Sequence, residues 1–506
     1  MSRPGVPLRW RWLRWFVPDL AFATACITLF YCLFLFQGTQ QLFRDSDAGW
    51  HLRNGETILA TGKLPRTDPY SFTRAGAPWY AWEWLADVAG GSIHRSFGLN
   101  GVAVFYATAI SAGVWLWFRL HWALGGNFLL ACAMAPLLLS TCNIHWLARP
   151  HVLSWLFLLL AIFPRRPNLI LVAAVTALWA NIHASFFFAP VIALIFLGQE
   201  LIEAEFHPSA GVVYYLKAFA ITALAPLLNP YGANLYVHVF RYLTDSELLS
   251  RIGEFQSFDF HSAGSGQILA AVLVGIVGGT LALSPWQGGS APMARRPAGI
   301  NREVRSTDFS QRRYHHFALA LLVTAMALRS ARALPLCALL LLPIANAAIT
   351  RWLPWPGLLA YGDNLRALDA KFQGLALAPP VVAAALCLTR GAAFPPDQFP
   401  VAAYPHIPAG ARLFAPDKFG GYLIYRSNGT LKVFFDGRSD FYGADFLKKY
   451  QRLVQVRPGW REYWDSFHFT HALVQTDTPL LPALEQIGWR RAYQDKTAVL
   501  LAFPGT

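Results

Sequence analysis

The sequence predicts an α-helical polytopic membrane protein with about eleven spans, followed by a small C-terminal α/β domain outside the cytoplasm. Of the 506 residues, 55% are hydrophobic and only 14% are charged. A soluble protein of this length needs more charged residues to cover its surface. The apolar residues also form blocks long enough to cross a bilayer. Charged residues return in the tail, 395–506, which indicates a second domain of soluble character.

The first span is expected at about 17–36, after Arg3, Arg9, Arg11 and Arg14. Its apolar run is longer than that of a cleaved signal peptide and has no small-residue cleavage site, so we expect it to stay in the membrane. Further spans are expected near 100–118, 127–141, 152–163, 169–180, 185–199, 217–228, 268–284, 316–328, 333–350 and 377–393. The shorter ones fall below the ~20 residues that a straight crossing needs. Two pairs could therefore be re-entrant hairpins: 152–163 with 169–180, and 316–328 with 333–350.

The positions of the basic residues predict the orientation. With the N-terminus in the cytoplasm, the cytoplasmic connections include Arg165 and Arg166 and the arginine-rich stretch 285–315, whereas the first external loop, 37–98, is balanced in charge. This distribution follows the positive-inside rule and places the tail outside the cytoplasm. It also explains most of the formal net charge of +14, so no nucleic-acid partner is expected.

The tail is predicted to alternate short strands and helices. Strands are expected at 431–435, 471–475 and 498–502, with a helix at 443–455. The chain therefore divides into a membrane domain, 1–394, and a soluble α/β domain, 395–506.

Polar side chains that are unusual in a membrane protein gather at span ends on the outer side. The first external loop contributes Asp45, Asp47, His51, Arg53, Asp68 and Glu83. Later external turns contribute Arg149, His151, Asn181, His183, Arg329 and Arg332. Ionisable groups at membrane depth usually face a cavity or one another. Their one-sided distribution predicts a single site that opens away from the cytoplasm.

These residue types fit a reaction between a hydroxyl acceptor and an anionic donor. Asp47 could take a proton from an attacking hydroxyl. Fork-like donors match phosphate oxygens, and three arginines could supply them: Arg149, Arg329 and Arg332. The histidines could orient phosphate or share a divalent cation with the carboxylates: His51, His151 and His183.

Structural roles are alternatives for several of these residues. Asp45 and Asp47 could simply cap the helix that starts near residue 48. Arg149 and Arg332 could extend from helix ends to lipid headgroups. The tryptophans of the first loop are expected in an interfacial aromatic belt: Trp50, Trp79, Trp82 and Trp84.

Several motifs resemble a known group of proteins. In the first loop they are Asp45-Ser46-Asp47, Trp50-His51-Leu52-Arg53, Asp68-Pro69-Tyr70-Ser71 and Glu83-Trp84-Leu85. Further along the chain they are Arg149-Pro150-His151, Asn181-Ile182-His183, Asn229-Pro230-Tyr231-Gly232, Arg329-Ser330 with Arg332, and Asp436-Gly437-Arg438. With these motifs the chain resembles uncharacterised bacterial multi-span membrane proteins. Through them it is similar to the GT-C glycosyltransferase superfamily, which includes protein O-mannosyltransferases and lipid A aminoarabinose transferases.

The resemblance implies an inverting glycosyltransferase that takes its sugar from a polyprenyl phosphate. It makes Asp47 the candidate base, and Asp45 its partner or a metal ligand. It makes four residues candidates for the donor phosphate: Arg149, His151, Arg329 and Arg332. Many relatives have adjacent acids in this loop, whereas Ser46 separates the two acids here, so either could align with the catalytic one. If the protein uses a divalent cation, Mg²⁺ or Mn²⁺, the residues expected to hold it are Asp45, Asp47 and His51.

The sequence therefore leads to a glycosyltransferase of the bacterial cytoplasmic membrane that acts on its outer face. Its expected partners are membrane lipid, a polyprenyl-phosphate sugar donor and a glycan, lipid or protein acceptor of the cell envelope. One alternative is a transporter or flippase for a lipid-linked glycan, which should have inverted repeats and polar residues at the membrane midplane. Another alternative is a non-catalytic cell-envelope scaffold whose tail binds a partner.

Overall fold

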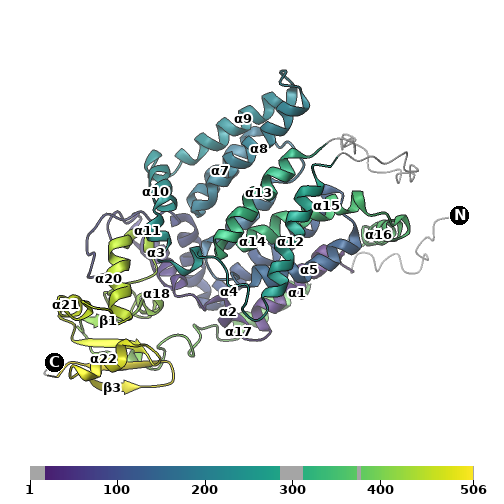
Figure 1. The fold of residues 1–506 in the computed structure, drawn as a ribbon. Coiled ribbons are helices and arrows are strands. Elements are labelled where there is room, and N and C mark those ends of the chain that lie inside the picture. Colours follow the sequence, from purple (N-terminus) through teal and green to yellow (C-terminus); the bar gives the residue numbers. More distant parts are fainter. Residues whose placement is uncertain (1–16, 285–311, 373–377, 505–506) are drawn as a thin grey trace.

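The computed structural model describes residues 17–284, 312–372 and 378–504. The N-terminal arginines and the part of the basic connection at 285–311 lie outside the described residues. Helices make up most of the molecule, and a small sheet lies at the end where the chain finishes (Figure 1).

A helix occupies each stretch predicted as a span. These helices are α1 (Leu20–Phe34), α4 (Trp84–Leu124), α5 (Phe128–Asn143), α6 (Pro150–Ala161), α7 (Leu169–Ile182), η3 with α8 (Ala184–Phe187, Phe188–Glu203), α9 with η4 (Ala210–Leu224, Ala225–Leu227), α12 (Ser265–Leu281), α13 (Tyr314–Arg329), α15 (Leu342–Trp352) and α17 (Ala378–Thr389). Three short helical segments lead into α15: η6 (Ala331–Ala333), α14 (Leu334–Leu336) and η7 (Cys337–Leu341).

Within the described residues, four helical stretches are long and apolar enough to cross a membrane: Trp84–Leu124, Ala184–Glu203, Ala210–Leu227 and Ala331–Trp352. Six further apolar helices are shorter than a full crossing. The chain thus has the apolar helices of a membrane protein, while the number of complete crossings stays a prediction.

Side-chain caps and one glycine mark where several of these helices begin or bend. Asp19 accepts a hydrogen bond from the backbone N–H of Phe22 at the start of α1, and Asn127 accepts one from Leu129 at the start of α5. These bonds satisfy N–H groups that a helix leaves without partners in its first turn. In α4 the backbone at Gly98 has φ 61° and ψ −160°, which breaks the helical path between its first part and its apolar part.

Much of the first external loop folds into helices. It contains α2 (Thr39–Leu42) and α3 (Asp47–Thr61), and α4 begins well before the predicted span. Other short helices lie between the apolar ones: α10 (Ala233–Thr244), α11 (Ser246–Leu249), η5 (Gly253–Phe255) and α16 (Pro356–Asp369). Of these helices only α3 was expected, as the helix that starts near residue 48.

The tail contains a four-stranded sheet of order β1-β2-β4-β3. Its strands are β1 (Leu413–Phe414), β2 (His471–Gln475), β3 (Arg490–Gln494) and β4 (Ala498–Ala502). β1 pairs with β2 in parallel, and β4 pairs with both β2 and β3 in antiparallel fashion. The helices are η8 (Tyr404–His406), α18 (Asp417–Arg426), α19 (Ser439–Tyr442), α20 (Ala444–Val454), α21 (Trp460–Asp465) and α22 (Leu480–Gln486).

Two of the three predicted strands and the predicted helix are present as β2, β4 and α20. The strand predicted at 431–435 is wrong, because this segment joins no sheet. Val433 instead makes one isolated bridge with Ser71 of the first loop. The apolar side chains of the segment 431–435 are buried because they lie between the first loop and the tail. This burial gives the same sequence pattern as a core strand.

The tail docks on the first external loop. In Figure 1, α3 lies between the helical part and the yellow tail elements, beside α18. Gly49 of α3 faces Gly421 of α18 so closely that a Cβ on Gly49 would lie 2.2 Å from the Gly421 carbonyl oxygen. The first loop is therefore packed between the membrane domain and the tail, and this arrangement positions the site.

Candidate active site

One cavity of about 1120 Å³ lies where the membrane domain, the first loop and the tail meet. Asp47, Arg149 and Arg332 all line it, although they come from three distant parts of the chain. The predicted convergence of the outer polar residues is therefore present. Also on its wall are Asp45, Glu83, His151, His183 and Arg329.

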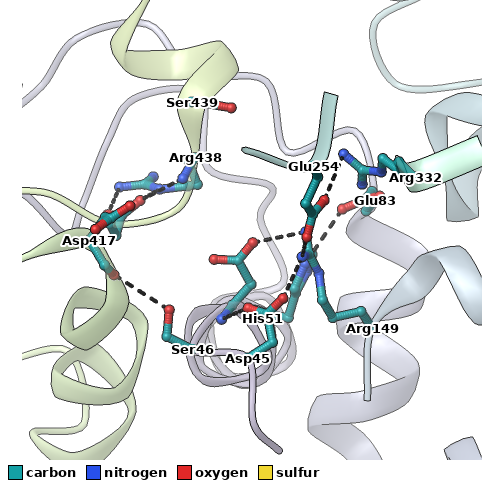
Figure 2. A network of polar contacts seen from close by, with 12 residues as sticks. Asp45, Ser46, His51, Glu83, Arg149, Glu254, Arg332, Asp417, Arg438 and Ser439 are labelled. Atoms are coloured by element: carbon teal, nitrogen blue, oxygen red, sulfur yellow. Dashed lines mark hydrogen bonds and ion pairs between the residues drawn. The ribbon is translucent and has the colours of Figure 1, made fainter. Parts of the chain in front are cut away.

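Arg149 is the centre of the polar network. It precedes Pro150, the first residue of α6, and its side chain is 13% exposed. Its Nη1 lies 2.6 Å from Oδ2 of Asp45, and its Nη2 lies 2.8 Å from Oδ2 of Asp47. Glu254 of η5 contributes a third carboxylate, 3.6 Å from Nη1 of Arg149. Figure 2 shows this group, with Arg332 on the far side of Glu254 at 3.5 Å.

The two first-loop acids, Asp45 and Asp47, have pKa values shifted in opposite directions. Burial and the neighbouring Asp45 carboxylate raise the pKa of Asp47 to about 6, against the lowering effect of Arg149. Burial also acts to raise the pKa of Asp45, but the Arg149 charge and the hydrogen bond from the Asp47 N–H outweigh it, so this pKa is lowered. Asp45 is thus the fixed anion of the pair, and Asp47 is the carboxylate that can exchange a proton near neutral pH.

Behind the cavity wall, His51 joins two further acids. Its Nδ1 lies 2.6 Å from Oδ1 of Asp87 on α4, and its Nε2 lies 3.5 Å from Oε2 of Glu83. Burial raises the pKa of Glu83 to about 7, although the His51 charge acts to lower it. Burial would lower the pKa of His51, but the Asp87 carboxylate outweighs it and raises the pKa. Glu83 is consequently a second group in this site that titrates near neutral pH.

The tail touches Asp47 directly. Gly437 lies so close that a Cβ at this position would be 1.9 Å from Oδ1 of Asp47. The next residue, Arg438, is held by Asp436 and by Asp68 of the first loop, with Nη2 2.8 Å from an oxygen of each. Any side chain larger than hydrogen at 437 would displace the Asp47 carboxylate, so the tail fixes where this group points.

One end of the cavity combines arginines with an apolar wall. The side chain of Arg329, at the end of α13, has no hydrogen bond or ion pair with any other described residue, and Arg332 has only Glu254 as an acidic partner. Apolar side chains of α6, η3, α8 and α13, and of the segment that leads into α15, line the same cavity: Leu158, Phe187, Phe188, Met326 and Leu336. This end can hold a phosphate that carries an apolar chain.

Neither a protein-family model nor a curated protein matches the sequence. The fold is similar to solved structures of the Archaeoglobus fulgidus oligosaccharyltransferase. One, tethered through a disulfide bond to an acceptor peptide with the NVT sequon, has a TM-score of 0.53 and 12% identity over 93% of this chain and 69% of the other. The apo form has a TM-score of 0.52 and 11% identity over 93% and 70%. The AglB structure with an inhibitory peptide and a dolichol-phosphate has a TM-score of 0.50 and 12% identity over 90% and 69%.

The chain has the GT-C fold. The predicted resemblance to the GT-C glycosyltransferase superfamily is confirmed at the level of architecture. TM-scores of 0.50 to 0.53 show the shared fold, and identities of 11% and 12% do not by themselves establish a reaction.

Some of the predicted site residues lie away from the cavity wall. Arg53 donates to the Tyr425 carbonyl of α18 on the other side of α3. Asp68 belongs to the buried pair with Arg438. Asn181 accepts a hydrogen bond from the indole of Trp84. These three side chains connect elements, and none of them lines the cavity.

The structural alternatives have different outcomes. Asp45 does accept a hydrogen bond from the N–H of Asp47, the first residue of α3, so it both caps the helix and pairs with Arg149. Arg149 does not extend to solvent or headgroups, because carboxylates surround it. The belt interpretation is wrong for Trp50 and Trp79, which are 6% and 4% exposed and pack inside the protein.

Glu254 and Asp87 were not among the predicted site residues. Glu254 lies between α9 and α12, in a connection predicted to be external, and Asp87 lies three residues after Trp84, where α4 begins. The sequence did contain a signal for Glu254, because it is an acidic residue in a connection predicted to be external, as are the other predicted site residues. Asp87 was not recognisable, because the first part of α4 was assigned to the first external loop, 37–98.

The GT-C resemblance assigns a possible divalent cation to Asp45, Asp47 and His51. Among the described residues, no three His, Cys, Asp or Glu side chains are grouped to hold a metal ion. Arg149 lies against both aspartates, and His51 is turned toward Asp87. In this arrangement Arg149 supplies the positive charge beside the two aspartates, and the divalent cation stays a prediction.

Proposed function

We propose that the protein is an inverting membrane glycosyltransferase that uses a polyprenyl-phosphate-linked sugar. The observation that carries this proposal is that one cavity holds Asp47, with its raised pKa, beside Arg329, Arg332 and an apolar wall. A hydroxyl acceptor needs a base, and a lipid phosphate needs cations and an apolar path. The GT-C fold and the dolichol-phosphate in the AglB structure support the same class of donor.

In the proposed reaction the acceptor hydroxyl oxygen attacks the anomeric carbon of the donor sugar. A new carbon–oxygen bond forms on the face opposite the phosphate, and the bond from the anomeric carbon to the phosphate oxygen breaks. Its electron pair leaves with the polyprenyl phosphate, and Asp47 receives the hydroxyl proton. Arg329 and Arg332 stabilise the negative charge that develops on the departing phosphate.

Arg149 has a different role in this proposal from the one its residue type suggested. Its guanidinium already contacts Asp45 and Asp47 and lies near Glu254. It therefore holds the carboxylates in place and favours the ionised form of Asp47. In this proposal the phosphate is bound by Arg329 and Arg332, which have fewer acidic neighbours than Arg149.

The test is the release of polyprenyl phosphate by purified protein in lipid nanodiscs. Undecaprenyl-phosphate hexoses serve as donors and a membrane glycan extract as the acceptor source. We expect Asp47→Asn to lower the rate by about 100-fold or more, the usual contribution of a general base. Asp465→Asn, at an exposed site in the tail, is the matched control and should leave the rate unchanged. Equal rates in Asp47→Asn and the unmodified protein would remove Asp47 from this role.

A further inference from the structure

The cavity has a second end that the proposed chemistry does not use. Its wall is formed by Trp82 of the first loop, Tyr242 of α10, and Ser439 and Asp440 of α19. These residues come from the first loop, the α10 connection and the tail, so only the folded chain brings them together. In Figure 2, Ser439 lies on one side of the carboxylate network and Arg332 on the other. The aromatic end holds Ser439 and the arginine end holds Arg332. The two ends adjoin through Tyr242, whose ring centroid lies 5.8 Å from that of Phe255, the ring over which Arg332 lies at 5.4 Å.

Trp82 offers a ring face without a stacked neighbour. His238 and Tyr242 meet its indole edge-to-face, with ring centroids 4.9 and 5.7 Å away and interplanar angles of 72° and 69°. Among the described residues, no ring or cation stacks flat on this indole, and its N–H has no hydrogen-bond partner. A half-buried indole of this kind can take a flat apolar surface from a ligand.

Asp440 is an acceptor paired with His238, the residue whose ring meets the Trp82 indole. Its Oδ2 lies 3.1 Å from Nε2 of His238, which in turn stacks on Tyr80 at 4.6 Å and 22°. Its Oδ1 has no hydrogen-bond partner among the described residues. Ser439 adds a hydroxyl 3.3 Å from that of Tyr242. The wall thus presents a carboxylate oxygen and two hydroxyls, which can accept from and donate to vicinal hydroxyl groups.

We propose that Trp82, Tyr242, Ser439 and Asp440 form a subsite for a pyranose ring of the acceptor, so that the acceptor is a glycan. A pyranose has an apolar face of C–H groups, which suits the indole, and equatorial hydroxyls, which suit Asp440 and Ser439. The assignment to the acceptor rests on the proposed function, because the donor phosphate and its apolar chain fit the arginine end. Binding of the sugar itself rests only on the four side chains.

Saturation-transfer difference NMR on the full chain in nanodiscs tests the binding. The probes are methyl pyranosides of glucose, galactose, mannose and N-acetylglucosamine. We expect ring protons of at least one probe to receive saturation, and Trp82→Ala to weaken its binding by about 2- to 10-fold, as for the loss of one aromatic contact. Asp440→Asn should weaken binding by about tenfold, since a hydrogen bond to a charged group is lost.

Matched controls separate the subsite from general effects. Trp355→Ala removes an exposed tryptophan at the start of α16, and Asp465→Asn removes an exposed tail carboxylate; both should leave binding unchanged. Trp82→Phe keeps an aromatic face and should retain most of the binding, and melting temperatures show whether each variant is folded. No saturation with any probe, or equal binding in folded Trp82→Ala and the unmodified protein, would overturn the proposal.

Kinetics distinguish the acceptor from the donor sugar. In the transfer assay, Trp82→Ala should raise KM for the acceptor and leave KM for the donor unchanged. A rise in the donor KM alone would overturn the acceptor assignment. Pyranoside binding that depends on Trp82, in a protein that releases no polyprenyl phosphate, would contradict the proposed function and leave the subsite in place.

Discussion

Arg149 controls the charge of the candidate site at the scale of single residues. Its two terminal nitrogens contact Asp45 and Asp47, and the third carboxylate, Glu254, lies near it. Without this guanidinium, Asp45 and Asp47 would lose their ion-pair partner, and their protonated forms would be favoured. The basicity of Asp47 therefore depends on a residue from a different part of the chain.

This dependence predicts a pH effect on transfer. Because Asp47 must be ionised to accept a proton and its pKa is about 6, kcat/KM should rise as pH increases through 6 and level off above it. Arg149→Gln removes a charge that favours the ionised form of Asp47, so the pKa of Asp47 should rise. The rising limb of the kcat/KM profile should then move to higher pH. The measurement is the pH profile of polyprenyl-phosphate release.

Two variants serve as controls for this profile. Glu83→Gln removes the other group that titrates near neutral pH, and the limb near pH 6 should remain. Arg332→Gln removes a different cavity arginine, so transfer should weaken without movement of the limb. Because Arg149 also acts to lower the pKa of Glu83, the Glu83→Gln variant decides between the two acids: disappearance of the rise near pH 6 in Glu83→Gln would assign the base role to Glu83 instead.

Single residues also show what the sequence can predict about this site. The convergence of Asp47, Arg149 and Arg332 was predictable for two reasons. The positive-inside rule places their loops on the same side of the membrane, and ionisable groups at membrane depth usually face a cavity or pair with one another. The partners of Arg149 were not predictable, since residue type alone suggests phosphate binding. Trp50 and Trp79 were misassigned to the membrane interface because composition does not distinguish lipid from a protein partner.

At the scale of elements, helix α3 depends on glycines for its position. Gly49 meets Gly421 of α18, and a Cβ on Gly55 would lie 1.8 Å from the Asp87 carbonyl oxygen of α4. α3 carries Asp47 at its first position, so these contacts set the place of the candidate base relative to the membrane domain and the tail.

Gly49→Ala tests this packing. The added methyl group has no room, because the Gly421 carbonyl would lie 2.2 Å from it, so the variant should lose about 1–3 kcal/mol of stability through overpacking. Gly266→Ala is the matched control, because a Cβ there meets nothing within 4 Å. Thermal unfolding of the two variants in the same nanodiscs measures the difference. Equal melting temperatures would show that α3 and α18 separate freely.

The helices were predictable where apolar periodicity extends over many residues, as in α4 and α12. The segment 431–435 was not, because its apolar residues face a first-loop partner that lies more than 350 residues earlier in the chain. Such burial depends on tertiary contact, and a local pattern cannot distinguish it from a sheet.

At the scale of the whole molecule, the tail is a wall of the site and not a separate appendage. Gly437 limits the space of Asp47, and Ser439 and Asp440 line the same cavity. The segments 70–74 and 432–434 exchange backbone hydrogen bonds, with Val433 N–H donating to the Tyr70 carbonyl at 3.0 Å. The sequence predicted a tail outside the cytoplasm but gave no sign that it completes the cavity, since the contacts join positions far apart in the chain.

Arg438 is the buried link that holds this wall, and it provides the last prediction. Its side chain is 1% exposed and joins Asp436 of the tail to Asp68 of the first loop. Arg438→Met leaves two buried carboxylates without a counter-charge, so we expect a loss of about 3–5 kcal/mol in stability. Arg461→Met is the control, because its partner Asp465 is exposed and such a surface pair contributes only about 0–1 kcal/mol. Limited proteolysis should cleave the tail rapidly in Arg438→Met alone, and transfer should fall with it. A tail equally resistant in both variants would show that the glycine contacts between α3 and α18 suffice to hold the wall, and that the Asp68–Arg438–Asp436 link is dispensable.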